Sequence, residues 1–479
     1  MKNQEGITVK KNTNFSEWFT QVVQKCELAD LRYHVKGFLV FQPWSVLSME
    51  KMYKYLENVL QKKSHKPYWF PTVIPKSNLK KESEHLKGFT PEVFWVTHGG
   101  TKKLEEPLAL RPTSETAFYQ MFNLWIRSYK DLPFKTYQRA NVFRHETKAT
   151  RPFLRSREFH WIETHCAHAT EENAFKQVLE DMGTTKEVLH DIFGIPFMFF
   201  ERPTWDKFPG ASRTFAADAL NPDGKVIQQP STHMISQKFS KAFDIKFRDK
   251  DEKEKDVYMT TYGPTISRIF ASVIITHGDD KGLKFPWEIA PLQVVIIPID
   301  KKVNKKAEAL KKEIETFASV EIDYSDKRPG EKFNYWETKG VPIRIDLGLK
   351  DLDKKKITIF RRDLDKKEII SEKQVIQKIK NISKEFTKNL IREADKIFKG
   401  RIKDAKNINE IKKTIKEGAI ARCNFCSVEK DGEKCAEIIE KETSAEVRGT
   451  RLDEKSKPTG KCVICEKPAK NIVYVAKSY

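Results

Sequence analysis

Residues 143–159 read FRHETKATRPFLRSREF, a stretch whose charged and aromatic side chains could surround a nucleotide. Apolar residues flank it on both sides, which predicts two strands joined by a long loop. Such a hairpin could present guanidiniums to phosphates, a carboxylate to an amino group and a ring to the face of a base. The residues in these positions are Arg144, Arg155, Glu146 and Phe159. A surface hairpin with ordinary ion pairs is the alternative that this segment alone leaves open.

A second segment, Leu110–Thr116, reads LRPTSET and places a hydroxyl beside a carboxylate. On an extended loop, Thr113 and Glu115 point to the same side of the chain. A carboxylate that faces a cavity suits an ammonium group. The alternative is a helix N-cap, because Thr113 or Ser114 followed by glutamate resembles a capping signal. Considered alone, the segment favours the cap.

A third segment, Tyr262–Arg268, is a turn that leads into an apolar helix. It places Arg268 in the first helical turn, where a cation opposes the helix dipole. This placement suggests another purpose for the guanidinium, such as binding a phosphate.

The composition indicates a globular protein with a polyanionic partner. The 479 residues, 39% of them hydrophobic, are enough for about two to four domains. No run of eighteen apolar residues occurs and the N-terminus lacks the apolar segment of a signal peptide, so we expect a cytoplasmic protein without a membrane span. The formal net charge of +21 favours nucleic acid as a partner, although lysines that merely solvate the surface would also raise it.

Five of the seven cysteines lie in the last sixty residues. Cys423 and Cys426, like Cys462 and Cys465, have the Cys-x2-Cys spacing of a four-cysteine zinc site. Cys435 is a fifth candidate. The odd total suits a reducing compartment better than a disulfide framework.

The periodicity changes along the chain. Amphipathic or charged patterns predict helices at residues 47–62, 171–193, 301–318 and within 371–417. Strands are predicted at residues 68–75, 320–324, 341–346 and 357–360. Residues 292–299 are almost all apolar, as in a strand buried on both faces. The part after about residue 288 therefore predicts a small α/β domain.

Together, the three segments resemble the motifs of class II aminoacyl-tRNA synthetases, and within that class the chain is similar to prolyl-tRNA synthetases of the archaeal and eukaryotic type. Phe143–Phe159 is similar to motif 2, Tyr262–Arg268 to motif 3, and Arg111–Thr116 to the proline-binding loop. The resemblance runs from about Phe15 to Tyr479. Other similar stretches are His85–Gly100, Trp161–Thr170, Thr276–Asp280 and Gln293–Pro298.

The resemblance implies an α/β chain of three folded domains after a flexible segment at 1–14. These are a class II catalytic domain with an antiparallel sheet at 15–288, an α/β anticodon-binding domain at 289–395, and a small C-terminal α/β domain with a cysteine cluster at 396–479. It also implies a homodimer, with Pro71 in the interface strand.

The implied activity is the two-step ligation of L-proline to tRNA(Pro), with ATP and Mg²⁺, through prolyl-adenylate. The catalytic residues would be Arg144 and Arg268. The ATP-binding residues would be Arg144, Glu146, Arg155, Phe159, Gln228 and Arg268. The proline-binding residues would be Thr113, Glu115, Arg144, Trp161, Glu163, Phe208 and His233. Positioning and electrostatics would do most of the catalysis.

The resemblance also assigns roles beyond the active site. Glu337, Arg344 and Lys350 would read the anticodon, although an ordinary cross-strand ion pair between Glu337 and Arg344 is the alternative. The ligands of a structural zinc ion would be Cys426, Cys435, Cys462 and Cys465, with Cys423 as the alternative to Cys435. The carboxylate of the terminal Tyr479 would turn toward the active site.

The chain between Phe159 and Arg268 is too short for the editing domain that bacterial relatives insert there. Since a pocket separates amino acids that differ by one methylene only about 10–200-fold, we expect measurable activation of alanine or cysteine. Two other functions remain open: an inactive synthetase-like tRNA-binding regulator, and a class II synthetase for another amino acid such as threonine or glycine. The retained arginines argue against the first, and the Thr113–Glu115 loop argues against the second.

Overall fold

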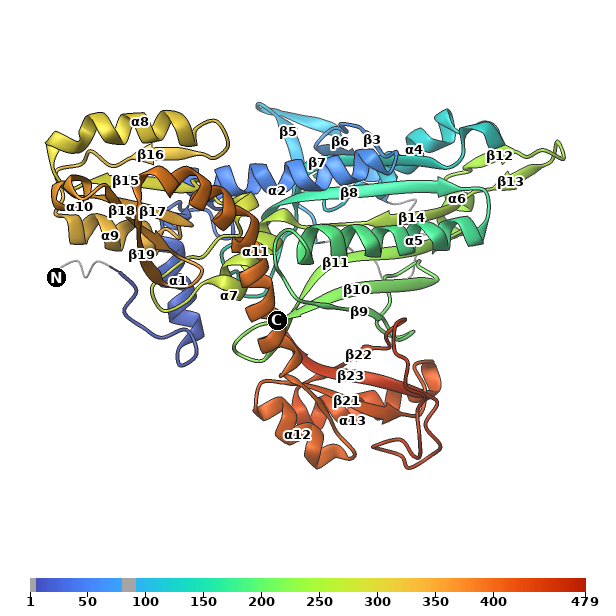
Figure 1. Cartoon of the computed structure of the whole chain (residues 1–479). Helices are drawn as coiled ribbons and strands as arrows, with labels where there is room; N and C mark the ends of the chain where they lie inside the picture. The colour runs from blue at the N-terminus through green and yellow to red at the C-terminus, as the bar shows by residue number, and fades with distance from the viewer. Residues whose placement is uncertain (1–5, 80–91) are drawn as a thin grey trace.

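The computed structural model describes residues 6–79 and 92–479, which form three lobes (Figure 1). Residues 85–91 of the similar stretch His85–Gly100 lie outside the described residues, as do residues 1–5 of the expected N-terminal segment. None of the helices in the described part of the chain has the length and apolar character that crossing a membrane requires.

The lobe that corresponds to the expected catalytic domain at 15–288, called the catalytic lobe below, is built on a largely antiparallel sheet. Its strands are β3 (Lys66–Pro67), β7 (Phe134–Phe143), β8 (Glu158–His168), β9 (Met198–Glu201), β10 (Arg213–Leu220), β11 (Lys225–Ser236) and β14 (Tyr258–Tyr262). A separate three-stranded sheet contains β4 (Val73–Pro75), β5 (Trp95–Gly99) and β6 (Lys102–Leu110). Short two-stranded ribbons pair β1 (Ala29–Asp30) with β2 (Val40–Phe41), and β12 (Lys246–Arg248) with β13 (Glu254–Asp256).

Helices cover this sheet and close its core. They are α1 (Phe15–Lys25), α2 (Pro43–Lys62), α4 (Glu115–Trp125), α5 (Glu171–Thr185), η2 (Lys186–His190), α6 (Lys238–Ala242) and α7 (Ile266–His277). Proline at the first position of α2 suits a helix start, because its missing N–H has no partner there. Helix α7 is buried almost all round, which explains its apolar sequence and fixes the position of Arg268 in its first turn.

The second lobe corresponds to the expected anticodon-binding domain at 289–395 and is called the anticodon-type lobe below. It has a five-stranded mixed sheet in the order β16-β15-β17-β18-β19. The strands are β15 (Val294–Pro298), β16 (Val320–Ile322), β17 (Ile343–Leu347), β18 (Lys356–Arg361) and β19 (Lys366–Ser371), and the helices are α8 (Asn304–Ile314), α9 (Pro329–Thr338), α10 (Leu349–Asp353) and α11 (Val375–Lys399). Val294–Ile297 is fully buried, which confirms the expected strand with two buried faces.

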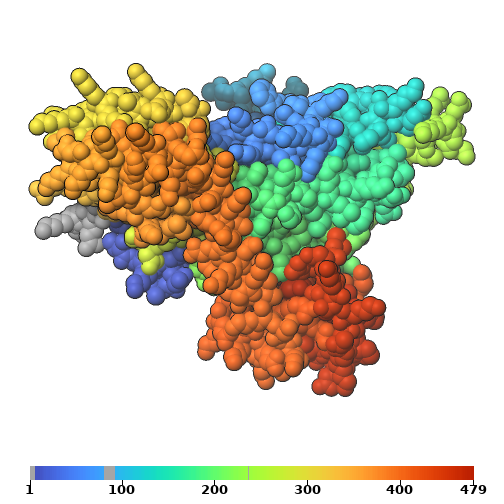
Figure 2. All heavy atoms as spheres, viewed as in Figure 1, coloured from blue at the N-terminus to red at the C-terminus, as the bar shows by residue number. Residues whose placement is uncertain are grey.

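The C-terminal lobe is joined to the catalytic sheet. It contains β20 (Ile402–Asp404), α12 (Ile408–Lys416), β21 (Ile420–Phe425), α13 (Glu433–Thr443), β22 (Glu446–Gly449) and β23 (Asn471–Ser478). Strand β23 pairs in parallel with β11 through Lys225–Lys477 and Val226–Ser478. In Figure 2 this lobe, coloured orange to red, lies against the catalytic lobe.

One local expectation was wrong. Of the strand expected at 68–75, only Val73–Pro75 (β4) is a strand, because prolines at 71 and 75 lack the N–H that a continuous ladder needs. The helices expected within 371–417 form as α11 and α12, and the short strand β20 lies between them. The other expected helices and strands occur with ends shifted by a few residues.

Candidate functional site

The catalytic sheet carries a cavity of about 580 Å³ that opens between β8, β11 and the start of α7. Eleven of the residues expected to bind ATP or proline line it: Thr113, Glu115, Arg144, Glu146, Phe159, Trp161, Glu163, Phe208, Gln228, His233 and Arg268. Arg155 does not line the cavity but lies beside it, with Nε 3.8 Å from Glu146 Oε2.

The opening hairpin forms as the sequence predicts. Strands β7 and β8 pair without a break from Phe134–Ala167 to Phe143–Glu158. Because side chains alternate along a strand, Phe159, Trp161 and Glu163 share the face that borders the cavity. The hairpin is therefore one wall of the site.

Arg144 extends from the end of β7 into the cavity. Its Nε donates to the main-chain oxygen of Pro112 at 3.0 Å, and its guanidinium lies 5.3 Å from the ring of Phe159 and 5.6 Å from that of Trp161. Solvent reaches the side chain through the open cavity, yet crowding by protein removes enough hydration to lower the pKa of the guanidinium. Three carboxylates oppose this shift: those of Glu115, Glu163 and Glu146.

Arg268 brings a second positive charge to the same cavity. Loss of hydration, followed by repulsion from Arg144 and Arg155, lowers the pKa of its guanidinium to about 10. Its protein contacts are long, 3.4 Å from Nε to Leu154 O and 3.3 Å from Nη1 to Gln228 O. A polyphosphate would relieve the repulsion among these arginines.

Glu163 is a buried carboxylate that holds in place the loop Arg111–Thr116, which was expected to bind proline. Its carboxylate oxygens accept hydrogen bonds from Ser114 N at 3.1 Å, Ser114 Oγ at 2.5 Å and Gln138 Nε2 at 2.6 Å. His165 Nε2 lies 3.2 Å from Glu163 Oε2. Burial opposes the charged form, but the bonds from His165, Ser114 and Gln138 keep the pKa of Glu163 below its usual value.

The same contacts bear on the two alternatives for residues 113–115. Ser114 occupies the N-cap position of α4, but its side chain does not cap the helix and binds Glu163 instead. Thr113 Oγ1 donates to Glu115 Oε2, so the hydroxyl and the carboxylate lie on the same side. Both line the cavity, although Glu115 is the first residue of α4 rather than part of an extended loop, so each alternative holds in part.

Trp161 has a buried indole N–H that finds no acceptor among residues 6–79 and 92–479. A Cβ added to Gly263 would lie 2.5 Å from Trp161 Cζ2, so only glycine in the Tyr262–Arg268 turn lets the indole lie so close. An unpaired donor beside a cavity is a place for a ligand acceptor.

His233 stands opposite, on β11. Its Nδ1 is 3.0 Å from Thr214 Oγ1, its Nε2 is 3.0 Å from Ser231 Oγ, and its ring lies 4.8 Å from that of Phe208. Burial lowers the pKa of His233 to about 3, with Arg202 adding to the effect. The imidazole is therefore neutral at physiological pH.

The C-terminal Tyr479 touches the loop of the opening hairpin. Its main-chain oxygen accepts from Arg155 Nη2 at 2.9 Å, and its hydroxyl binds Arg151 Nη1. Its N–H donates to Val226 O at 3.1 Å. The end of the chain thus lies next to the arginine expected to bind outer phosphates.

Several site residues were not identified from the sequence. Gln138, Ser231 and Arg202 contact the network or the cavity from strands or loops that carry no local motif. His165 also lines the cavity; it lies two residues after Glu163 on β8, so strand alternation places it on the same face.

In the anticodon-type lobe, Arg344 is fully paired. It bonds Glu337 Oε1 at 2.5 Å and Asp346 Oδ1 at 2.7 Å, and it lies between the rings of Phe333 and Phe360. The ion pair expected as the alternative to anticodon reading does form, but it joins helix α9 to strand β17 rather than two strands. Lys350 is exposed on α10.

Four cysteines meet at one point of the C-terminal lobe: Cys426, Cys435, Cys462 and Cys465, whose sulfur atoms lie within 4.8 Å of one another. A sulfur-only donor set of this size fits a tetrahedral zinc ion with Zn–S bonds of about 2.3 Å. Cys423 is not part of this group but lies in the apolar core of the lobe, where burial raises the pKa of its thiol to about 12. The expected choice of Cys435 over Cys423 is confirmed for the cluster.

Comparisons with known proteins cover almost the whole chain. Three family models match it: the tRNA synthetase class II core domain (G, H, P, S and T) at residues 94–277, an anticodon binding domain at 293–382, and the prolyl-tRNA synthetase C-terminal domain at 408–479. A proline–tRNA ligase of Thermofilum pendens is 46% identical over 486 aligned residues that cover 100% of both chains. One of Methanobrevibacter smithii is 43% identical, covering 97% of this chain and 99% of that one.

Two solved structures share the same fold over nearly their full length. The Giardia lamblia prolyl-tRNA synthetase in complex with prolyl-adenylate has a TM-score of 0.94 and 38% identity, covering 99% of this chain and 100% of that chain. The prolyl-tRNA synthetase of Cryptosporidium parvum complexed with L-proline and AMP has a TM-score of 0.92 and 30% identity, covering 100% of this chain and 98% of that chain.

Proposed function

The chain belongs to the class II prolyl-tRNA synthetases of the archaeal and eukaryotic type, and we propose that its cavity joins proline to ATP around one guanidinium, that of Arg144. The activity of the family is the ATP-dependent ligation of proline to tRNA(Pro). The observation that supports the proposal most is the position of Arg144 between the Thr113–Glu115 loop and the ring of Phe159.

In the first step, the proline carboxylate attacks the α-phosphate and pyrophosphate leaves. Arg144 binds the carboxylate and the α-phosphate together, which aligns them and neutralises the charge that builds at phosphorus. No protein nucleophile is required, because the attacking oxygen belongs to proline. Preorganised charge therefore carries most of the catalysis.

The nucleotide lies along the β7–β8 hairpin. Phe159 stacks on the adenine ring, while Glu146 accepts from its amino group. Arg155 and Arg268 bind the outer phosphates, where Mg²⁺ would neutralise further charge. Loss of hydration is the main cause of the lowered pKa of Arg268, and repulsion from Arg144 and Arg155 adds to it, so an anion among the three arginines would relieve that repulsion. Gln228 contacts the nucleotide from β11.

Proline occupies the opposite end of the cavity. The carboxylate of Glu115 and the hydroxyl of Thr113 accept from its imino group, and Glu163 keeps their loop in position. Trp161, Phe208 and the neutral His233 enclose the ring. An apolar pocket of this kind suits a side chain without polar atoms.

The other lobes serve tRNA and stability. Glu337, Arg344 and Lys350 take part in binding the anticodon of tRNA(Pro), in which case the Glu337–Arg344 pair must open or present its free edges to the bases. The four-cysteine cluster would hold zinc as a structural ion, which ties the loop at 462–465 to β21 and α13.

A homodimer completes the proposal. Trp69 is 92% exposed, and it lies in the segment that carries Pro71. Val46 and Leu47 on α2 are also exposed apolar residues. These exposed apolar side chains are available to a partner subunit, and light scattering of the protein alone should give twice the mass of one chain.

Amino-acid-dependent ATP–pyrophosphate exchange tests the proposed function. We expect exchange with proline and little with threonine or glycine. Exchange driven by threonine or glycine would identify a synthetase for another amino acid. No exchange with any amino acid, in a protein that still binds tRNA(Pro), would identify an inactive regulator.

A further inference from the structure

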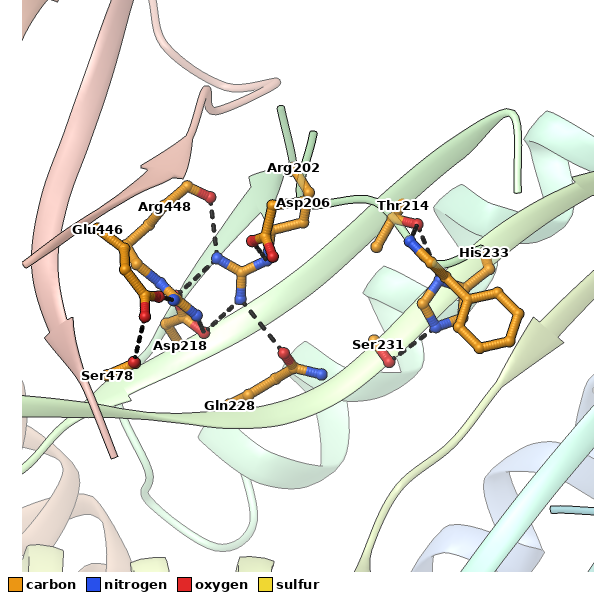
Figure 3. Close-up of polar contacts among 11 residues, drawn as sticks. Arg202, Asp206, Thr214, Asp218, Gln228, Ser231, His233, Glu446, Arg448 and Ser478 are labelled. Carbon is orange, nitrogen blue, oxygen red and sulfur yellow. Dashed lines mark hydrogen bonds and ion pairs between the residues drawn. The ribbon is translucent and has the colours of Figure 1, made fainter. Parts of the chain in front are cut away.

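A buried cluster of charges connects the C-terminal lobe to the cavity (Figure 3). Asp218 on β10 lies between two arginines, and none of the three side chains is more than 6% exposed. Its oxygens accept from Arg202 at 2.8 and 3.1 Å and from Arg448 at 2.8 and 3.3 Å. Arg448 belongs to β22 of the C-terminal lobe, whereas Arg202 lines the cavity.

Arg202, held by Asp218, in turn contacts the side chain of Gln228. Arg202 Nη2 lies 3.5 Å from Gln228 Oε1, and Asp218 is the cross-strand partner of Gln228. A guanidinium has only donors, so the amide atom that faces it must be the oxygen. The amide nitrogen of Gln228 is therefore left to point away from Arg202, as Figure 3 shows.

The backbone of the C-terminal lobe is fixed to the same segment. Glu201 and Thr450 exchange two main-chain hydrogen bonds, at 2.8 and 3.1 Å. A Cβ added to Gly449 would lie 2.0 Å from Glu201 O, so this approach requires glycine. Arg202 also donates to Arg448 O at 2.9 Å. Arg448 thus meets Arg202 in one fixed geometry.

We propose that Arg448, Asp218 and Arg202 are positioning residues of the C-terminal and catalytic lobes that hold the Gln228 amide with its NH₂ group toward the nucleotide. The ATP atom that Gln228 recognises is then a hydrogen-bond acceptor, which could be a ribose hydroxyl oxygen, a ring nitrogen of the base or a phosphate oxygen. This inference rests on the proposed function, because it assumes that Gln228 contacts ATP.

Arg448→Met tests the relay in the full-length protein. The change leaves Asp218 paired with Arg202, so no buried charge loses all its partners. Without Arg448, Asp218 is held by fewer hydrogen bonds and therefore orients Arg202, and through it Gln228, less precisely. We expect KM for ATP in proline-dependent exchange to rise about fivefold while KM for proline changes less than about twofold. The matched control is Arg451→Met, which removes an arginine three residues away that contacts Met198 and Asp453. It should leave both KM values unchanged.

A double-mutant cycle with Gln228→Ala separates positioning from general stability. If Arg448 acts through Gln228, Arg448→Met adds little once Gln228 is truncated. The proposal that Arg448 acts through Arg202 on Gln228 would be overturned by any of three results. These are equal changes in both KM values, no change in either KM value, or effects of the two substitutions that multiply in the double variant. If Arg448→Met does not fold, Arg448→Lys replaces it in the same comparison, because lysine keeps the charge but not the two-point contact with Asp218. Wild-type protein without proline-dependent exchange would refute the proposed function instead.

Discussion

Glu163→Gln is the substitution for which the structure gives the clearest energetic expectation. The carboxylate lies within hydrogen-bonding distance of five donors, which are Ser114 Oγ at 2.5 Å, Gln138 Nε2 at 2.6 Å, Ser114 N at 3.1 Å, His165 Nε2 at 3.2 Å and Thr113 Oγ1 at 3.4 Å. Glutamine keeps one acceptor oxygen but places an NH₂ group against the remaining donors. Leaving a buried hydrogen-bond donor without an acceptor costs about 1–3 kcal/mol for each group.

For a domain of this size, a loss of about 3 kcal/mol lowers Tm by roughly 5–10 °C. The Thr113–Glu115 loop also loses its anchor, so KM for proline should rise about tenfold while KM for ATP changes less. Thermal unfolding and pyrophosphate exchange measure the two effects. The control is Glu172→Gln, an exposed glutamate paired with Lys176 on α5, for which we expect no change in either.

The pH dependence of this difference follows from the lowered pKa of Glu163. A carboxylate whose folded pKa lies below its unfolded value of 4.5 stabilises the fold above that pH and loses this contribution as the pH falls through the folded pKa. The stability difference between wild type and Glu163→Gln should therefore stay constant from pH 8 to about 5 and narrow below about 4.5. An unchanged Tm and an unchanged KM for proline would refute the role assigned to Glu163.

Three further predictions concern other parts of the molecule. The pKa of His233 is lowered to about 3, so below pH 6.5 this residue binds a proton in the unfolded chain but stays neutral in the folded chain. Lowering the pH from 7.5 to 5.5 should therefore reduce the free energy of unfolding by about 1.4 kcal/mol more in wild type than in His233→Gln. Urea unfolding at both pH values measures this, and equal reductions in the two proteins would contradict it. Cys435→Ser should lower zinc content measured by elemental analysis, whereas Cys423→Ser should not; zinc retained in Cys435→Ser would remove that residue from the ligand set. Deleting Tyr479, which binds Arg155 and Arg151, should lower proline-dependent exchange by weakening ATP binding, while Tyr479→Phe, which keeps the main-chain oxygen, should be affected less; equal activity of the deletion and wild type would count against this contact.

The elements that could be predicted from sequence carry their signals locally. The β7–β8 hairpin is recognisable from apolar residues on both sides of a charged loop, and β15 from an uninterrupted apolar run. Thr113 and Glu115 are only two residues apart, so their shared side follows from backbone geometry. In these cases the neighbours along the chain are also the neighbours in space.

The remaining features depend on contacts between distant segments. Strand β23 joins the catalytic sheet through β11, about 250 residues earlier in the sequence. Arg202, Asp218 and Arg448 look like ordinary surface charges in sequence, yet they form a buried cluster across two lobes. The Ser114 side chain illustrates the same limit, since its capping signal is outcompeted by Glu163, 49 residues away.

The central claim, that Arg144 serves both reactants, is tested most directly by proline-dependent ATP–pyrophosphate exchange in Arg144→Ala. Removing a preorganised positive group from the reacting phosphate should lower kcat/KM by about 100-fold or more, with Tm close to that of wild type. Arg139→Ala is the control, because Arg139 lies on β7 of the same hairpin but pairs with Glu50 and does not line the cavity. Exchange at the wild-type rate in folded Arg144→Ala would contradict the account.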